Sequence, residues 1–439
     1  MRFTSTNQRA PVAGFREVLR QGLAPDGGLY QPVDLPRLGE ADLAAWRGLP
    51  FGAVAQRLAR RLLAGEFSED VLDRIAGDAM NFPVPVRPLG EGLWLVELFH
   101  GPTLAFKDFG ARFLARLFSE VLHEEGGHAT VLVATSGDTG SAVARGFAGV
   151  PGTRVVVLYP AGKVSPFQEA QMATIGGNVT AVRVAGVFDD CQRLVKAALL
   201  DAGLAGLRLS SANSINIGRL LPQAFYYVSS YLDVAARPGE PAVFAVPSGN
   251  LGNLTAGVMA ARMGLPVSRF VAATNANDVL PEYLDSGRFR PRPSIPTLSN
   301  AMDVGDPSNF ARLAAMYGAS AARMAGEIAG MRVSEDETRA AIRAAYRRCG
   351  VLLDPHAAVA YSAAVRFQET MKPAAPVIVL ATAHPAKFAD VVREELGVEP
   401  ELPDAERDWR SRPLLAIDLP DASPAAFRDL LMRLSPASS

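Results

Sequence analysis

The segment HGPTLAFKDFG (100–110) contains the residue of this chain best suited to covalent chemistry, Lys107. Lys107 lies between Phe106 and Asp108, beside side chains that favour burial. Burial disfavours the charged form of a lysine and lowers its pKa, and a neutral amine is a nucleophile toward carbonyl groups. An equally consistent interpretation is a lysine that passes its apolar neighbours to reach Asp108 or solvent.

A second segment, ATSGDTGSA (134–142), connects an apolar run to a helical pattern through hydroxyl side chains and glycines. Hydroxyl groups and backbone N–H groups at the start of a helix form a site for an anion such as a carboxylate. The simpler interpretation is ordinary helix capping by Thr135, Ser136 or Thr139. Two glycines and three hydroxyls in six residues exceed what a cap requires, so the composition favours a ligand.

The segment PSGNLGNLTAG (247–257) has the same order of apolar run, glycine-rich turn and helical pattern. Gly249 and Gly252 permit close approach of the backbone, so that successive N–H groups can surround a phosphate. The segment matches neither the GxxxxGK[ST] loop nor the GxGxxG fingerprint, which argues against nucleoside triphosphates and dinucleotides.

Two further polar segments follow apolar runs. SSANSINIGR (210–219) contains Asn213, Ser214 and Arg219, and this arginine is either an anion ligand or part of a surface ion pair. LATAHPAKF (380–388) contains Thr382, His384 and Lys387 near the carboxyl end of a predicted strand, where open α/β sheets bind ligands.

Lysine is rare in this chain, and its positions are informative. Arginine supplies most of the 44 basic residues, and the five lysines are Lys107, Lys163, Lys196, Lys372 and Lys387. Lys107 and Lys387 fall within the segments described above and Lys163 within the segment LYPAGKVSPFQEAQM (158–172), whereas Lys196 and Lys372 belong to ordinary helical or turn surface. A lysine able to form an imine, a phosphate-binding loop and a carboxylate-binding loop together predict pyridoxal 5′-phosphate catalysis on an amino acid.

Composition excludes several other classes of protein. The 439 residues carry a formal net charge of −1 with no basic run, which gives no footprint for nucleic acid or an anionic membrane. No apolar stretch reaches the roughly 18 residues of a membrane span, and the first ten residues lack the apolar core of a signal peptide. The two cysteines show no paired spacing and the five histidines no HExxH motif, so we expect a cytoplasmic protein without a catalytic metal.

From about residue 130 the chain alternates continuously apolar runs with amphipathic helical patterns, which predicts an open parallel sheet covered by helices. The expected strands are 93–98, 130–136, 153–160, 179–185, 207–212, 242–248, 269–275 and 376–382. The expected helices are 139–148, 165–175, 189–200, 220–235, 254–263 and 387–396. We expect a mainly helical first hundred residues, a long functional loop at 290–309 and helical segments from Phe310 to Arg348.

These motifs occur in the order found in the threonine synthase family, in its longer bacterial and yeast form, and the chain resembles that family from about residue 10 to residue 400. The resemblance extends to the segments LYPAGKVSPFQEAQM, TLSNAMDVGDPSN and DPHAAVAY. It implies the tryptophan synthase β-type fold (fold type II), with two open, twisted, mainly parallel sheets flanked by helices and a helical N-terminal region. The implied division is 1–95 (N-terminal region), 96–215 (smaller domain), 216–400 (larger domain) and 401–439 (C-terminal extension).

The resemblance also implies roles for individual residues. Lys107 matches the lysine that forms the Schiff base, and Thr382 matches the residue beside the pyridine nitrogen. The loop that binds the cofactor phosphate is matched by Gly249, Asn250, Leu251, Gly252 and Asn253. The stretch that holds the substrate carboxylate in relatives such as cysteine synthase is matched by Thr135, Ser136 and Thr139, with Asp138 close to the cofactor where those relatives carry Asn.

The implied reaction converts O-phospho-L-homoserine and water to L-threonine and phosphate by γ-elimination and β-addition of water. The leaving phosphate needs a cationic site of its own, for which the candidate cations are Lys163 and Arg219, with Asn213 and Ser214 as hydrogen-bond donors. The alternatives are another fold type II lyase, such as a serine/threonine dehydratase or an amino-acid phospholyase, and a non-catalytic ligand-binding paralogue. A monomer or a homodimer is consistent with the sequence.

Overall fold

The computed structural model describes residues 1–434, and the last five residues of the predicted C-terminal extension lie outside that range. Contacts group the chain into two compact units. The first comprises residues 1–2, 31–106 and 220–402, and the second comprises, among the described residues, 3–30, 107–219 and 403–434. The four-part division inferred from the sequence stays a prediction.

The first unit is built on a six-stranded sheet in which only the last pair is antiparallel. In spatial order its strands are β12 (Ile328–Arg332), β11 (Val267–Thr274), β10 (Ala242–Pro247), β13 (Val377–Ala381), β5 (Leu93–Glu97) and β4 (Val86–Gly90). Its helices are α2 (Glu40–Trp46), α3 (Phe51–Leu62), α4 (Glu69–Ala79), α10 (Ala224–Val234), α11 (Gly252–Met263), α12 (Val279–Ser286), α13 (Phe310–Met316), α14 (Ala321–Glu327), α15 (Glu335–Cys349), α16 (Pro355–Met371) and α17 (Ala389–Leu396).

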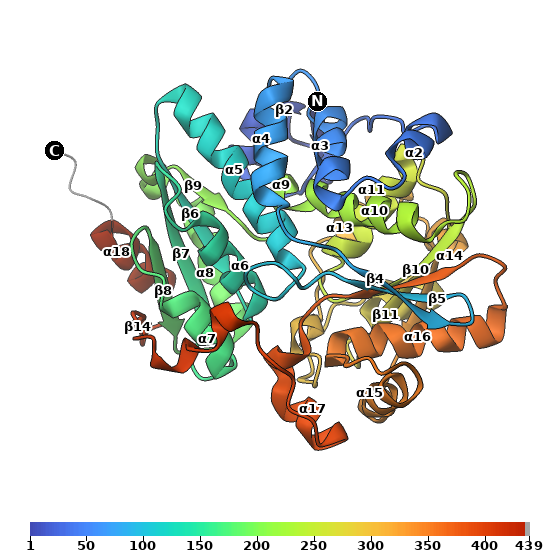
Figure 1. Cartoon of the computed structure of the whole chain (residues 1–439). Helices are drawn as coiled ribbons and strands as arrows, with labels where there is room; N and C mark the ends of the chain where they lie inside the picture. The colour runs from blue at the N-terminus through green and yellow to red at the C-terminus, as the bar shows by residue number, and fades with distance from the viewer. Residues whose placement is uncertain (435–439) are drawn as a thin grey trace. The chain divides into compact units, whose positions relative to one another are not determined.

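Helices cover this sheet on both faces, which is why its two central strands, β10 and β13, are apolar at every position. Val243 and Ala245 of β10 belong to the core beneath α15 and α16, and α16 lies along that face in Figure 1. Phe244 points to the other face, where its ring centroid is 4.9 Å from that of Tyr227 of α10. Successive side chains of this buried strand therefore pack against two separate layers of helices, one on each face of the sheet.

The second unit contains a five-stranded sheet whose strand pairs are all parallel. In spatial order its strands are β14 (Ile417–Leu419), β8 (Val179–Val184), β7 (Thr153–Pro160), β6 (Ala129–Ala134) and β9 (Leu209–Ser211). Its helices are α1 (Phe15–Gln21), α5 (Lys107–Glu125), α6 (Asp138–Phe147), α7 (Pro166–Ala173), α8 (Phe188–Leu200) and α18 (Pro424–Leu434). Apolar side chains of α8 and α18 pack on one face of this sheet.

The two open, mainly parallel sheets confirm the predicted fold class, and β7 has the expected bounds of 153–160. The N-terminal region contains the expected helices together with short strands. These strands form a three-stranded sheet in the order β2 (Ala13–Gly14), β1 (Arg2–Ser5) and β3 (Tyr30–Pro32). The long loop at 290–309 is confirmed, with one 3₁₀ turn at Asn300–Met302.

One expectation was wrong. The segment from Phe310 to Arg348 is not helical throughout, because β12 lies within it and pairs with β11. Only pairing with a strand far away in the sequence turns this segment into a strand.

In each unit, the motif segments follow the carboxyl ends of parallel strands. The loop beginning at Thr135 follows β6 of the second unit. In the first unit, the loop beginning at Ser248 follows β10, and Thr382 follows β13. These are the edges at which open α/β sheets bind ligands.

Candidate active site

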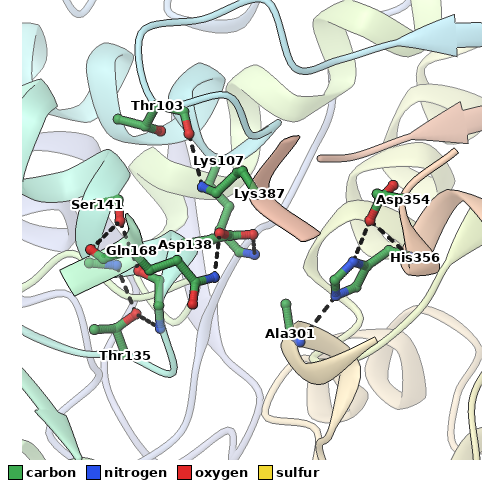
Figure 2. Close-up of polar contacts among 12 residues, drawn as sticks. Thr103, Lys107, Thr135, Asp138, Ser141, Gln168, Ala301, Asp354, His356 and Lys387 are labelled. Carbon is green, nitrogen blue, oxygen red and sulfur yellow. Dashed lines mark hydrogen bonds and ion pairs between the residues drawn. The ribbon is translucent and has the colours of Figure 1, made fainter. Parts of the chain in front are cut away.

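Lys107 and Asp138 lie together in the second unit, each as the first residue of a helix (Figure 2). The Nζ atom of Lys107 is 3.4 Å from Oδ2 of Asp138, and the two side chains are 15% and 2% exposed. The amine is therefore shielded from most solvent and still accessible to a small molecule. A partly buried amine beside a single carboxylate can form an imine and can exchange a proton.

The loop before Asp138 is held by the hydroxyl of Thr135. Its Oγ1 accepts the backbone N–H groups of Gly137 and Gly140, at 2.9 and 2.8 Å. Gly137 has a φ of 139°, which side-chain-bearing residues rarely adopt. Since Thr135 is buried and bonded within the loop, Ser136 and Thr139, which are half-buried, remain as the hydroxyls for a ligand at the start of α6.

Asn213 fixes where this loop starts. Its side-chain amide donates to the carbonyl of Ala134 at 2.8 Å and accepts the N–H of Ala134 at 3.2 Å. The side chain thus continues the pairing of β9 with β6 by one further step. Ser214 is half-buried next to it.

Arg219 is buried in the second unit, where Nη1 donates to the carbonyl of Ala212 at 2.6 Å. Burial lowers the pKa of Arg219 to about 10, and the nearby Asp108 opposes that shift. A Cβ atom at Gly110 would lie 2.5 Å from the carbonyl oxygen of Arg219, so α5 packs directly on this segment. Arg219 therefore braces the start of α5, whereas Lys163 lies in an exposed turn after β7.

In the first unit, the loop between β10 and α11 presents the N-terminus of a helix. Leu251 has a left-handed φ of 59° and turns the chain into α11. The Nδ2 atom of Asn253 donates to the carbonyl of Pro247 at 2.8 Å, and its Oδ1 accepts the N–H of Leu254 at 2.9 Å. The first N–H groups of a helix have no acceptor inside it, and the first turn of α11 has no acidic residue, so the loop suits an anion.

A second segment supports this loop from behind. A Cβ atom at Gly249 would lie 2.7 Å from Cα of Met302 and 3.1 Å from the carbonyl oxygen of Ala301. The N–H of Ala301 donates to Nε2 of His356 at 3.1 Å, and Nδ1 of His356 lies 2.5 Å from Oδ2 of Asp354 (Figure 2). The ring of His356 therefore connects the backbone of Ala301 to the carboxylate of Asp354.

Sequence reasoning gave no role to His356, although the segment DPHAAVAY was recognised as a family motif. The signal that was available is Asp-Pro at the start of a helix, which predicts the observed capping of α16 by Asp354. The bond to Ala301 connects positions 55 residues apart in sequence, and it could not be read from the sequence.

We expect His356→Ala to destabilise the first unit by about 2 kcal/mol, because the N–H of Ala301 and the carboxylate of Asp354 both lose a partner in a buried site. His356→Gln, whose amide oxygen can still accept from Ala301, should lose less. Thermal unfolding of the cofactor-free protein measures both. Equal melting temperatures for wild type and His356→Ala would contradict the supporting role of His356.

Thr382 is buried, and it belongs to a segment that pairs with the residues before Lys107. The N–H of Phe106 donates to the carbonyl of Thr382 at 2.9 Å, and the N–H of His384 donates to the carbonyl of Leu104 at 3.0 Å. Lys387 is also buried, and its Nζ donates to the carbonyl of Thr103 at 2.9 Å. These bonds fix the backbone up to the residue before Lys107.

His384 of the first unit is held in its neutral form. Burial lowers the pKa of His384 to about 4, and the nearby His100 adds to the shift. The unfolded chain therefore binds a proton between pH 6.5 and 4 that the folded chain does not. The contribution of neutral, buried His384 to the free energy of unfolding is fully present above pH 6.5, and it is lost as the pH falls to about 4.

We expect His384→Asn to reduce this loss, because Asn can still accept the N–H of Ala386 as His384 does and has no charge to gain. The difference in the free energy of unfolding between the variant and the wild type should change by at most about 3 kcal/mol between pH 7 and pH 4. Urea unfolding at a series of pH values measures it. Parallel curves for the two proteins would exclude this contribution of His384.

The residues of the two units fit pyridoxal phosphate, each by its own geometry. The second unit supplies a partly buried lysine beside a carboxylate. The first supplies an anion-binding helix start whose glycine, Gly249, is packed so closely that a Cβ would collide with backbone. The described residues, 1–434, contain no group of side chains able to hold a metal ion.

Comparison with known proteins agrees with a pyridoxal-phosphate-dependent enzyme. Residues 81–383 match the family model of pyridoxal-phosphate-dependent enzymes, so the chain is a member of that class. Models for the threonine synthase N-terminus and C-terminal region match residues 2–80 and 357–431. The chain belongs to the threonine synthase family.

Individual relatives match along the whole chain. The threonine synthase of Haemophilus influenzae is 41% identical over 420 residues, covering 95% of this chain and 96% of the relative. That of Escherichia coli is 41% identical over 419 residues, with the same coverage. The crystal structure of PLP-bound threonine synthase from Brucella melitensis superimposes with a TM-score of 0.92 at 38% identity and full coverage of both chains. The crystal structure of threonine synthase from Escherichia coli superimposes with a TM-score of 0.91 at 39% identity, covering 99% of this chain and all of the other.

Proposed function

We propose that this threonine synthase uses pyridoxal phosphate to convert O-phospho-L-homoserine and water to L-threonine and phosphate. The observation that carries the proposal is the partly buried Lys107 beside Asp138, in a chain matched over its whole length by threonine synthases. The reaction breaks the bond between Cγ and oxygen, releases phosphate, and places a hydroxyl group on Cβ.

We assign cofactor binding residue by residue. Lys107 would bond the aldehyde carbon, and Thr382 would lie beside the ring nitrogen. The cofactor phosphate would be held at the start of α11 by Gly249, Asn250, Leu251, Gly252 and Asn253. When bound, pyridoxal phosphate supplies an electron-withdrawing ring that stabilises negative charge on the substrate carbons.

The protein itself moves protons and binds anions. As a free amine, Lys107 would accept the proton from Cα of the substrate and would return one to Cγ. Ser136, Thr139 and the start of α6 bind the substrate carboxylate, while Thr135 holds their loop in shape.

For the leaving phosphate we assign direct contacts to the exposed Lys163 and the half-buried Ser214. Asn213 and Arg219 act through the backbone, because their side chains are bonded to Ala134 and Ala212. This differs from the direct role that their sequence motif suggested for both residues. The burial of Arg219, which is 3% exposed and lies beside Asp108, supports this assignment because it leaves the guanidinium group little access to a substrate.

We further propose a cytoplasmic protein that works as a monomer or homodimer. The part of the chain that the structure describes contains no helix long and apolar enough to cross a membrane. Both cysteines are free thiols, Cys191 buried and Cys349 partly buried. Free thiols are typical of a reducing compartment.

The test is to incubate the holoenzyme with O-phospho-L-homoserine and to measure phosphate, threonine and 2-oxobutyrate together. We expect phosphate and threonine in equal amounts. Phosphate with 2-oxobutyrate and no threonine would identify a dehydratase or phospholyase instead, and no product at all would favour a ligand-binding paralogue.

A further inference from the structure

Gln168 connects Asp138 to helix α7, and neither the motif analysis nor the proposed reaction uses it. The side chain is 1% exposed, and its Nε2 donates to Oδ1 of Asp138 at 2.9 Å (Figure 2). The other carboxylate oxygen, Oδ2, is the one that faces Nζ of Lys107. Gln168 and Lys107 therefore contact opposite oxygens of the same buried carboxylate.

The orientation of the Gln168 amide is fixed by the start of α7. Its Oε1 accepts the N–H of Ser165 at 3.1 Å, and Oγ of Ser165 accepts the N–H of Gln168 at 3.2 Å. This reciprocal pair is a capping box, in which the side-chain oxygen has to face the backbone. The nitrogen of the amide consequently has to face Asp138.

Close packing prevents this amide from moving away. A Cβ atom at Gly137 would lie 2.4–2.5 Å from the amide atoms of Gln168, so the amide lies directly on the backbone of the loop. Ser141 also ties the two segments together, with Oγ 3.2 Å from the carbonyl of Gly137 and 3.4 Å from that of Gln168.

A carboxylate as buried as that of Asp138 needs donors in order to remain ionised. The amide of Gln168 supplies one such donor from a fixed direction, and the remaining oxygen is then held toward Lys107. Rotation of the Asp138 side chain away from Lys107 would break the bond to Gln168.

We propose that Gln168 is a positioning residue that holds Asp138 as a carboxylate aimed at the nitrogen of Lys107. Its effect on Lys107 is a property of the chain without cofactor. Its effect on catalysis rests on the proposed function, because Lys107 is the group that transfers the protons.

The decisive variant is Gln168→Glu. Glutamate retains the acceptor for the N–H of Ser165, since Ser-x-x-Glu is itself a favourable capping box, but it places an acceptor where Asp138 needs a donor. In Gln168→Met the methionine side chain has a similar length, but it offers neither the acceptor for Ser165 nor the donor for Asp138. Ser165→Ala is the matched control, because it removes one bond of the cap and leaves the bond from Gln168 to Asp138 in place.

The first readout needs no cofactor. Trace acetic anhydride labels amines in their neutral form, so labelling of Lys107 as a function of pH gives its pKa, with the exposed Lys196 as internal reference. We expect Gln168→Glu to raise the pKa of Lys107 by about one unit, because a second carboxylate is added. Gln168→Met should lower it by about one unit, because the ion pair loosens, and Ser165→Ala should leave it unchanged.

The second readout is the split between kcat and KM for threonine formation. We expect kcat to fall about ten- to hundredfold in both Gln168 variants, with KM changed less than about threefold and Ser165→Ala within about twofold of wild type. The proposal would be overturned if Lys107 were labelled in both Gln168 variants with the same pH dependence as in the wild type. It would also be overturned if Gln168→Glu kept the wild-type kcat, or if Ser165→Ala lost as much kcat as the Gln168 variants. If wild type formed no threonine, the proposed function would fail, while the labelling would still decide the role of Gln168.

Discussion

Replacing Lys107 by alanine should reduce the rate of threonine formation by at least about 10³-fold, because the variant loses both the amine that bonds the cofactor and the base that accepts the proton from Cα. The side chain of Lys107 is 15% exposed, and its amine is 3.4 Å from the carboxylate of Asp138. Lys387 is bonded to a backbone carbonyl, and Lys163 is exposed. Steady-state assays of the purified variant measure the loss.

Lys107→Arg is the matched control for charge. Arginine keeps a cation beside Asp138 but forms no imine, so it should be as inactive as alanine while preserving the melting temperature better. Borohydride reduction of the wild-type holoenzyme should leave the cofactor attached to the peptide that contains Lys107. Attachment to a peptide with Lys163 or Lys387 would show that the assignment is wrong.

Gly249→Ala should weaken cofactor binding about ten- to hundredfold. The added methyl group would lie 2.7 Å from Cα of Met302, and relief requires either the loop or the supporting segment to move. The supporting segment is held by the bond between Ala301 and His356, so the displacement should fall on the loop that we propose to bind the cofactor phosphate. Titration of the cofactor-free variant with pyridoxal phosphate measures the change in the dissociation constant.

Gly326→Ala is the control, since a Cβ atom there meets nothing within 4 Å and the residue lies in helix α14. It should bind the cofactor as the wild type does. An unchanged dissociation constant for Gly249→Ala would mean that the loop tolerates the methyl group. The close packing at Gly249 would then not be required for cofactor binding.

The sequence predicted the sheets well because their strands are apolar on both faces and are bounded by helical patterns. The strand at 153–160 was predicted to the residue, and both glycine-rich loops were placed at strand ends. In these segments, local composition and tertiary environment agree.

Elements that depend on distant partners were missed. The strand β12 lies in a stretch read as helical, because its residues become a strand only by pairing with β11. The strand β14 lies in the last forty residues, for which no strand was predicted, and it becomes the edge of a sheet by pairing with β8. Long-range pairing of this kind leaves little trace in a single sequence.

The same limit applies to the site. The hydroxyl of Thr135 and the side chains of Asn213 and Arg219 were read as ligand contacts, whereas their bonds in the structure run to the protein backbone. Gln168 and His356 were overlooked, because each acts on a residue far away in sequence. Residue type and spacing identified the chemistry, but which polar groups remained for a ligand depended on the folded chain.

The most direct test of the central claim is to run the reaction in water labelled with ¹⁸O and to analyse both products. Elimination of phosphate followed by addition of water at Cβ places one ¹⁸O in the hydroxyl group of threonine and none in the phosphate, because the bond between Cγ and oxygen breaks. Labelled phosphate together with unlabelled homoserine would show attack at phosphorus. That result would contradict the account.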